Sequence, residues 1–235
     1  DQMQEEVVKT LRLMLDVYHK LGFNKILMDL ETRPDSEFRI GSDEIWDKAE
    51  GALQHALDVN NIEYEIAEHD AAFYGPKIDI KMKDCLGREW QMGTVQVDFQ
   101  LPLRFNLSYI DSEGNKKTPV MIHRALFGSL ERFIGILIEH YAGAFPTWLA
   151  PVQVKLIPVN NEYHLDFVNK VKELLLKENI RLEVDERDEK LGYKIREAQT
   201  KKIPYQLVVG DNEVQNNLLT IRRYGSKDTE TLSVE

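Results

Sequence analysis

Residues 119–133 read Pro-Val-Met-Ile-His-Arg-Ala-Leu-Phe-Gly-Ser-Leu-Glu-Arg-Phe and join two kinds of secondary structure. The first part completes a strand from Thr118 to His123, and the apolar run that follows predicts a helix from Arg124 to Tyr141. Upstream, residues 78–82 alternate polar and apolar side chains, and a turn leads to a second strand over 89–99. Successive hairpins followed by a helix predict an antiparallel sheet packed by helices, which is an α+β fold.

The organisation changes after residues 145–151, Phe-Pro-Thr-Trp-Leu-Ala-Pro, because the two prolines cannot continue a helix. The segment that follows predicts strands and helices in the order β-α-β-α-β-β, which is typical of a small α/β domain with a mixed sheet. We therefore expect a first domain over residues 1–146, a linker over 147–151 and a second domain over 152–235.

Composition excludes several classes of protein. The chain has 235 residues, of which 43% are hydrophobic, and no apolar run approaches the roughly 18 to 20 residues that span a bilayer. A net charge of −10 argues against a generic nucleic-acid coat protein. Residues 151–235 have a net charge of only −1, so this part is better able to approach a polyanion. Cys85 is the single cysteine, which excludes an internal disulfide.

Both ends of the chain suggest a piece of a longer protein. Asp1 stands where an initiating methionine is expected, and no targeting signal follows it. Residues 232–235 resemble the end of a strand followed by Ser233 as the N-cap of a helix. We expect a fragment whose final helix is missing.

Two cations stand out. Arg132 lies in the predicted apolar helix, where a buried guanidinium is costly unless it is paired. It either pairs with a neighbouring carboxylate or clamps a phosphate or nucleotide, for which a planar guanidinium is suited. Lys77 follows Gly75-Pro76, a rigid turn that can aim an ammonium group at an anion, although such a lysine is ordinarily solvated.

Polar residues interrupt the predicted strand over 89–99. Gln91, Thr94 and Gln96 would not share a face of a flat strand, whereas a bulge near Gly93 would bring both glutamines to one face. The alternative is that they are exposed polar residues of a strand. His123 ends the next strand, and a lone histidine is more often a core or turn residue than a metal ligand. A zinc site would need further ligands from elsewhere.

Basic residues gather within sixteen positions of the second domain. Such a run is usually a solvated face, but here it lies in the less acidic domain, so contact with an RNA backbone is also possible. The residues are Arg187, Lys190, Lys194, Arg196, Lys201 and Lys202.

These motifs together resemble a known family. Residues 119–133 look like motif 3 of a class II aminoacyl-tRNA synthetase, and residues 145–152 look like the junction to the class IIa anticodon-binding domain. Residues 74–79 and 90–99, with His123, resemble the bacterial-type threonyl-tRNA synthetases in particular. The resemblance covers essentially the whole chain. It implies a partial class II catalytic domain, an anticodon-binding domain, and ligation of threonine to its tRNA through a threonyl-adenylate.

The resemblance also implies roles for single residues. Lys77 would stabilise charge on the reacting phosphate, and Arg132 would lie against ATP. Gln91 and Gln96 would line the region of ATP and the terminal adenosine, with Gln96 near the chemistry. His123 would be one of three zinc ligands, and zinc would bind the amino and hydroxyl groups of threonine. Substrate contacts would come from Tyr74, Thr94 and Ser129, and anticodon contacts from Lys190, Glu213 and Arg222, while Asp188 replaces an asparagine expected beside them.

The implied partners are ATP with Mg²⁺, threonine and threonine tRNA, in a cytoplasmic homodimer without membrane or DNA contacts. Motifs 1 and 2 and the other zinc ligands are absent from the chain, so we expect the fragment alone to be inactive and to bind zinc poorly. Two alternatives stay open. One is a synthetase-like module that binds tRNA or regulates without catalysis, and the other is a different class IIa enzyme such as the prolyl one. The intact Lys77, Gln96 and Arg132 favour an enzyme.

Overall fold

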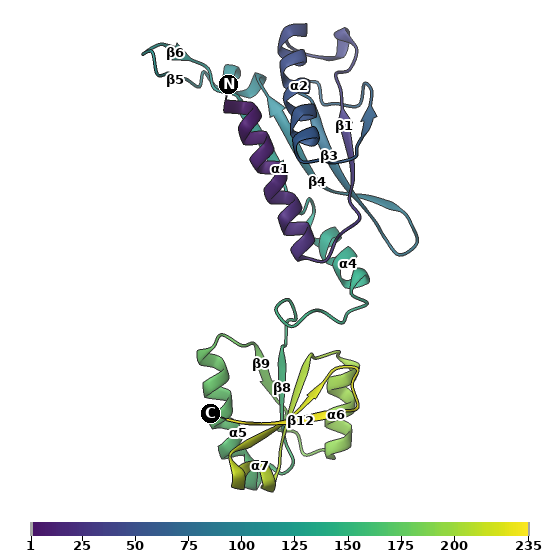
Figure 1. Cartoon of the computed structure of the whole chain (residues 1–235), viewed down its shortest axis with the longest axis vertical. Coiled ribbons are helices and arrows are strands. Elements are labelled where there is room, and N and C mark those ends of the chain that lie inside the picture. Colours follow the sequence, from purple (N-terminus) through teal and green to yellow (C-terminus); the bar gives the residue numbers. More distant parts are fainter. Residues whose placement is uncertain (1, 235) are drawn as a thin grey trace. The chain divides into compact units, whose positions relative to one another are not determined.

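The computed structural model describes residues 2–234 and divides, between Leu137 and Ile138, into two compact units (Figure 1). Unit 1 ends at Leu137, and unit 2 begins at Ile138. Each unit has its own sheet and its own helices. Among the described residues, no helix is long and apolar enough to cross a bilayer.

Unit 1 is built on a five-stranded sheet in the order β2-β1-β3-β4-β7. All neighbouring pairs are antiparallel except β1 and β2, which are parallel and therefore depart from the predicted antiparallel sheet. The predicted α+β class is confirmed. The strands are β1 (Leu27–Glu31), β2 (Glu65–Ala67), β3 (Lys77–Lys83), β4 (Glu89–Asp98) and β7 (Met121–Ala125).

Two amphipathic helices cover one face of this sheet. Helix α1 (Gln2–Lys20) buries side chains at three- and four-residue steps, as its sequence pattern predicts, and packs beside α2 (Asp43–Val59). The even-numbered residues of β3 meet these helices, so that face is apolar. The opposite face carries the polar residues. The buried helix residues include Val7, Leu11, Met14, Tyr18, Trp46, Leu53 and Leu57.

A bulge in β4 confirms one prediction from the sequence. Ile80 of β3 pairs with Gly93, but the next residue, Lys81, pairs with Gln91, so that Met92 is the extra residue of β4. Glycine is required beside the bulge, because a Cβ on residue 93 would lie 2.3 Å from the hydroxyl oxygen of Tyr18. The bulge restores Gln91 to the polar face that Thr94 and Gln96 also share.

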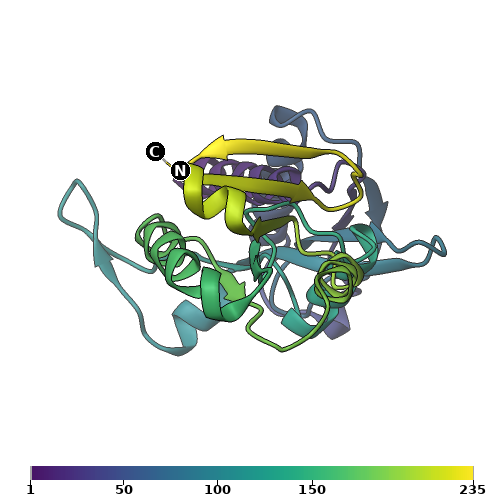
Figure 2. The ribbon, with the colours of Figure 1, turned by 90° about the horizontal axis from the view of Figure 1, so that it is seen from below.

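The segment after β7 differs from the prediction. Helix α4 (Leu130–His140) begins at Leu130, not at Arg124, because Arg124 and Ala125 remain paired with β4. Gly128 adopts a φ of +53°, and the carbonyl of Ser129 accepts the first helical hydrogen bond, from Phe133. Between β4 and β7, the two short strands β5 (Tyr109–Ile110) and β6 (Lys116–Lys117) form a hairpin that extends away from the rest of unit 1 in both views (Figure 2). The short helices η1 (Ser36–Phe38) and α3 (Gln100–Arg104) complete the unit.

Unit 2 has a mixed sheet, as predicted, and its five strands lie in the order β12-β11-β10-β8-β9. The last three of these strands are parallel, and β11 and β12 are antiparallel. Helix α7, whose start is capped by Glu213, was not predicted. Of β12 only the end was predicted, because its short polar sequence lacks an apolar run, and Ser233 is the last residue of this strand. The elements are β8 (Val154–Pro158), α5 (Asn161–Lys177), β9 (Leu182–Val184), α6 (Leu191–Thr200), β10 (Tyr205–Val209), α7 (Asp211–Asn216), β11 (Leu218–Arg223) and β12 (Thr229–Ser233).

Gln206 in the central strand β10 gives a test of the packing of unit 2. Its side chain is fully buried, and neither amide atom has a hydrogen-bond partner among the described residues. Because an unsatisfied buried amide costs about 1–3 kcal/mol, we predict that Gln206→Met stabilises unit 2 by about that amount. A higher urea midpoint and slower hydrogen exchange of β10 amides would show it. The exposed Gln215→Met is the control, and a destabilised Gln206→Met would contradict the prediction.

Candidate functional site: a polar face on the sheet of unit 1

One row of side chains crosses four strands of the sheet of unit 1. Strand pairing places Glu31 opposite Lys77, Lys77 opposite Gln96, and Gln96 opposite His123. Because residues directly opposite each other point to the same side of a sheet, these four side chains lie on one face. We call this the polar sheet face; it consists of Glu31, Lys77, Asp79, Gln91, Thr94, Gln96, Asp98 and His123.

Lys77 is held by two carboxylates. Its Nζ lies 2.7 Å from Oε2 of Glu31 and 2.9 Å from Oδ2 of Asp79. Burial opposes the charge on Lys77, but the two carboxylates outweigh it and raise the pKa of the amine. The lysine is thus a fixed cation of the sheet and not the solvated turn residue of the alternative reading.

The carboxyl groups beside Lys77 have different protonation behaviour. Burial, together with the neighbouring Asp79 carboxyl, raises the pKa of Glu31 to about 7. Asp79 is also buried, but the neighbouring Glu31, Lys77 and Thr94 side chains hold the pKa of its carboxyl below the ordinary value, and Lys77 donates a hydrogen bond to it. Around neutral pH, Glu31 is therefore protonated part of the time, beside an ionised Asp79 and a charged Lys77.

Tyr74 precedes β3 and reaches over the same row. Its hydroxyl donates a 3.2 Å hydrogen bond to Oε1 of Gln96, and its ring packs edge-on at 6.4 Å from the ring of His123. This arrangement brings together Tyr74, Gln96 and His123, three residues that the sequence reading assigned to the substrate or metal region.

His123 pairs with a residue that the sequence analysis missed. Its Nε2 lies 2.9 Å from Oδ2 of Asp98, whose side chain is fully buried. An imidazole bound to a carboxylate through one nitrogen is the usual arrangement of a metal ligand, so His123 fits one position of a zinc site. Within residues 2–234, no group of three His, Cys, Asp or Glu side chains could hold a metal ion.

Arg132 is not buried, contrary to the sequence reading. It is exposed at the start of α4, where Nη1 donates to the backbone carbonyl of Gln91 at 3.2 Å and the guanidinium stacks 5.4 Å from the ring of Trp90. Ser129 accepts from the Arg132 amide at 3.4 Å and donates to Glu131 at 2.8 Å. The guanidinium therefore stands at the edge of the polar sheet face, with its plane held by Trp90.

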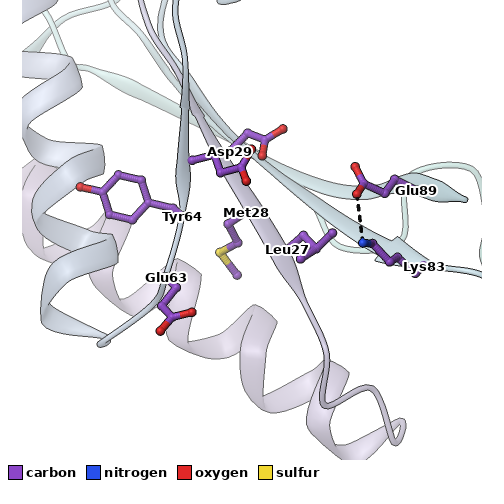
Figure 3. A pocket seen from close by; sticks show the side chains of 8 residues that line it. Leu27, Met28, Asp29, Glu63, Tyr64, Lys83 and Glu89 are labelled. Atoms are coloured by element: carbon purple, nitrogen blue, oxygen red, sulfur yellow. Dashed lines mark ion pairs between the residues drawn. The ribbon is translucent and has the colours of Figure 1, made fainter. Parts of the chain in front are cut away.

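A hollow lies at the other end of β1, β3 and β4, away from the row of side chains that contains His123 (Figure 3). Lys83 and Glu89 form an ion pair of 3.4 Å at its rim, and Asp29 and Tyr64 also line it. The volume of this hollow is about 380 Å³. Lys77 and Lys83 stand at opposite ends of β3, so this hollow is separate from the row that contains His123.

The predicted anticodon residues lie in unit 2 in different settings. Lys190 is exposed at the N-cap of α6, and Arg222 is half-buried in β11. Glu213 accepts from the hydroxyl of Thr220 at 2.7 Å and from the Gly210 amide at 2.9 Å, which lowers the pKa of its carboxyl despite partial burial. Glu213 therefore caps α7, a structural role that the sequence reading did not foresee.

The basic run of unit 2 is not a uniform solvated face. Lys194 is buried, and its Nζ donates to the backbone carbonyl of Asp185 at 3.1 Å. Arg187 is paired with Asp185 and Glu197 at 2.7 and 2.6 Å. Lys201 also pairs with Glu197 at 2.8 Å, and Lys202 donates to the backbone carbonyl of Ala142. Four of the six predicted basic residues thus have partners within the chain, which leaves fewer unpaired cations for RNA.

Comparison with known families bears on this geometry. The family described as tRNA synthetase class II core domain (G, H, P, S and T) matches residues 1–141, and the family described as anticodon binding domain matches residues 153–235. The chain belongs to the class II tRNA synthetase core family. The predicted combination of a class II core with an anticodon-binding domain is thereby confirmed.

Curated relatives of this class II synthetase chain are named threonine--tRNA ligase. The relative from Clostridium botulinum strain Langeland is 52% identical over 235 residues, and that from Oceanobacillus iheyensis is 48% identical over 237 residues. Both matches cover all of this chain but only 36% and 37% of the relatives' own length. The resemblance to threonyl-tRNA synthetases is confirmed, and the chain spans little more than a third of these relatives.

Solved structures agree with the assignment to class II. The RNA binding domain of threonyl-tRNA synthetase from Cryptosporidium parvum is 37% identical, with a TM-score of 0.89 over 99% of this chain and 58% of that one. A putative threonyl-tRNA synthetase from Aeropyrum pernix is 30% identical, with a TM-score of 0.79 over 98% and 55%. Prolyl-tRNA synthetase from Cryptosporidium parvum, at 18% identity and a TM-score of 0.62 over 99% and 43%, shares the fold.

The protonation of Glu31 gives a stability prediction. Because its folded-state pKa of about 7 exceeds the ordinary value of 4.5, its stabilising contribution is complete below about pH 4.5 and is lost as the pH rises through 7. We expect unit 1 to lose up to about 3 kcal/mol over this range. In Glu31→Gln that loss should disappear. Urea unfolding at several pH values, read by hydrogen exchange of β1 and β3 amides, measures it.

The matched control for this prediction is Glu68→Gln, which removes an exposed carboxyl of the same unit. Its stability should follow the same pH dependence as the unaltered chain. If Glu31→Gln also keeps that dependence, the raised pKa of Glu31 is not the cause.

Proposed function

We propose that this chain is part of a threonine--tRNA ligase, which joins threonine to its tRNA through a threonyl-adenylate. The observation that carries the proposal is the row of Lys77, Gln96 and His123 on one sheet face, with Arg132 at the edge of that face. The relatives named threonine--tRNA ligase support it across the whole chain.

Residues on and beside the polar sheet face have tasks in the first step, in which the threonine carboxylate attacks the α-phosphate of ATP. Lys77 stabilises the charge that develops on this phosphate, since its ammonium is already fixed by two carboxylates and needs little reorganisation. Arg132 lies against ATP, and Mg²⁺ accompanies the nucleotide. Gln91 and Gln96 line the ATP and terminal-adenosine region, and Tyr74, Thr94 and Ser129 surround the substrate.

His123 contributes one ligand of a zinc ion, and the remaining ligands come from outside this chain. When bound, zinc supplies a coordination position that a hydroxyl and an amino group of the substrate can fill. An apolar pocket distinguishes valine from threonine only by about a hundredfold, so a site that demands a hydroxyl rejects valine more strongly. His123 is thus the residue of this chain that links the sheet to amino-acid selection.

Unit 2 would bind the anticodon of threonine tRNA through Lys190, Glu213 and Arg222. The hydrogen bonds of Glu213 to Gly210 and Thr220 keep its carboxylate in one orientation, which suits a fixed contact to a base. Asp188 replaces the asparagine that the family pattern leads us to expect, so this position accepts and does not donate at neutral pH. The full-length enzyme would be a cytoplasmic homodimer.

ATP–pyrophosphate exchange in the full-length protein tests the proposed function. We expect strong exchange with threonine, weaker exchange with serine and little with valine. Lys77→Ala should lower the rate by about 10²–10³-fold, and His123→Ala should abolish threonine-dependent exchange and remove zinc. Lys83→Ala is the matched control, since it removes an exposed lysine at the other end of β3. Exchange with proline would show that the substrate is proline and not threonine. No exchange with any amino acid would favour a non-catalytic tRNA-binding module.

A separate measurement addresses the 235-residue chain by itself. We expect it to show no adenylate formation, because His123 and Lys77 supply only part of the substrate and metal contacts. Detectable threonine-dependent exchange by the isolated chain would contradict this expectation.

A further inference from the structure

We propose that Asp98 is a positioning residue that fixes the tautomer of His123, so that Nε2 carries the proton and the lone pair of Nδ1 is available to a cation. This inference rests on the proposed function, in which His123 binds zinc. Asp98 was not among the residues that the sequence reading assigned to the site.

The hydrogen bonds of Asp98 determine which atom carries the proton. Oδ1 accepts from the backbone amides of Gln100 at 2.7 Å and Leu101 at 3.0 Å, and Oδ2 lies 2.9 Å from Nε2 of His123. An ionised carboxylate only accepts hydrogen bonds, so the atom facing Oδ2 must be a protonated nitrogen. The fully buried Asp98 therefore selects the Nε2–H form of the ring.

The consequence concerns the other ring nitrogen. A neutral imidazole has one protonated nitrogen and one lone pair, so a proton on Nε2 leaves the lone pair on Nδ1. Carboxylates that bind one nitrogen of a metal-ligating histidine fix its tautomer and ring orientation in this way. The ring of Tyr74, packed edge-on against His123, further restrains the imidazole.

The substitution Asp98→Asn separates tautomer control from packing. Asparagine has nearly the same shape, and its side-chain oxygen must stay with the amides of Gln100 and Leu101 to keep those two hydrogen bonds. Its NH₂ group then faces His123, so Nε2 must become the acceptor and the proton must move to Nδ1. The lone pair offered to a cation is lost, although the side chain keeps its size.

The chain contains a matched control. His164 also faces a carboxylate, with Nε2 at 2.9 Å from Oδ1 of Asp211, but its Nδ1 accepts from the Asn160 amide at 3.0 Å. That backbone bond fixes the same tautomer independently. The side chain of Asp211 is 83% exposed, so in Asp211→Asn the amide can turn its oxygen toward His164. The tautomer of His164 should therefore not change.

Imidazole ¹⁵N NMR of the 235-residue chain, at about pH 9 where ordinary imidazole is neutral, reads both tautomers directly. His123→Gln identifies the His123 signals. We expect Nε2–H at His123 in the unaltered chain, Nδ1–H in Asp98→Asn, and no change in Asp211→Asn. An unchanged tautomer in folded Asp98→Asn would overturn the proposal. An Nδ1–H tautomer of His123 in the unaltered chain would also overturn the proposal. This second test does not require Asp98→Asn to fold.

Zinc binding by the full-length protein links the tautomer to the metal. We expect Asp98→Asn to weaken zinc binding about 10–100-fold and Asp211→Asn to leave it unchanged. A switched tautomer with unchanged zinc affinity would overturn the positioning role. If His123→Ala retains zinc, the proposed function of His123 fails instead, while the NMR result on the chain still decides whether Asp98 sets the tautomer.

Discussion

The pairing of β4 between β3 and β7 is the constraint on which the site depends. This strand contributes Gln91, Thr94 and Gln96, and Gln91 shares the face of the other two only because Met92 is an extra residue in the pairing with β3. The close approach of Tyr18 to the backbone of Gly93 leaves no room for a Cβ at that point. A shift of one residue in this register would turn the polar side chains that β4 contributes toward the apolar helices.

The polar sheet face is assembled from charges that compensate one another across strands. Lys77 of β3 is held by Glu31 of β1 and by Asp79 two residues further along its own strand. Removing one partner would leave a buried charge without compensation, which costs far more than an exposed pair contributes. The same principle applies to Asp98, whose buried carboxylate is satisfied by two backbone amides and His123. The ionic groups thus position one another.

In unit 2, several basic side chains that the sequence suggests are solvated make contacts within the fold. Lys194 donates to backbone carbonyls beneath the helix surface, and Arg187 joins two carboxylates. Fewer unpaired cations are therefore available to a polyanion than the six clustered basic residues imply. The small number of unpaired cations agrees with the acidic net charge, which argues against general attraction to nucleic acid.

The sequence by itself determined the classes of the two domains, the apolar stripe of α1, the bulge in β4 and the family, because these depend on local periodicity and contiguous motifs. It misplaced the start of α4, because the pairing of Arg124 with β4 is a tertiary contact. It also missed the short helix α7, although the cap from Glu213 to the Gly210 amide is local, and it predicted only the end of β12. Only the tertiary structure revealed that Glu31 and Asp98 belong to the site. Their partners lie 46 and 25 residues away along the chain, and no local pattern records a contact between strands that the sheet brings together.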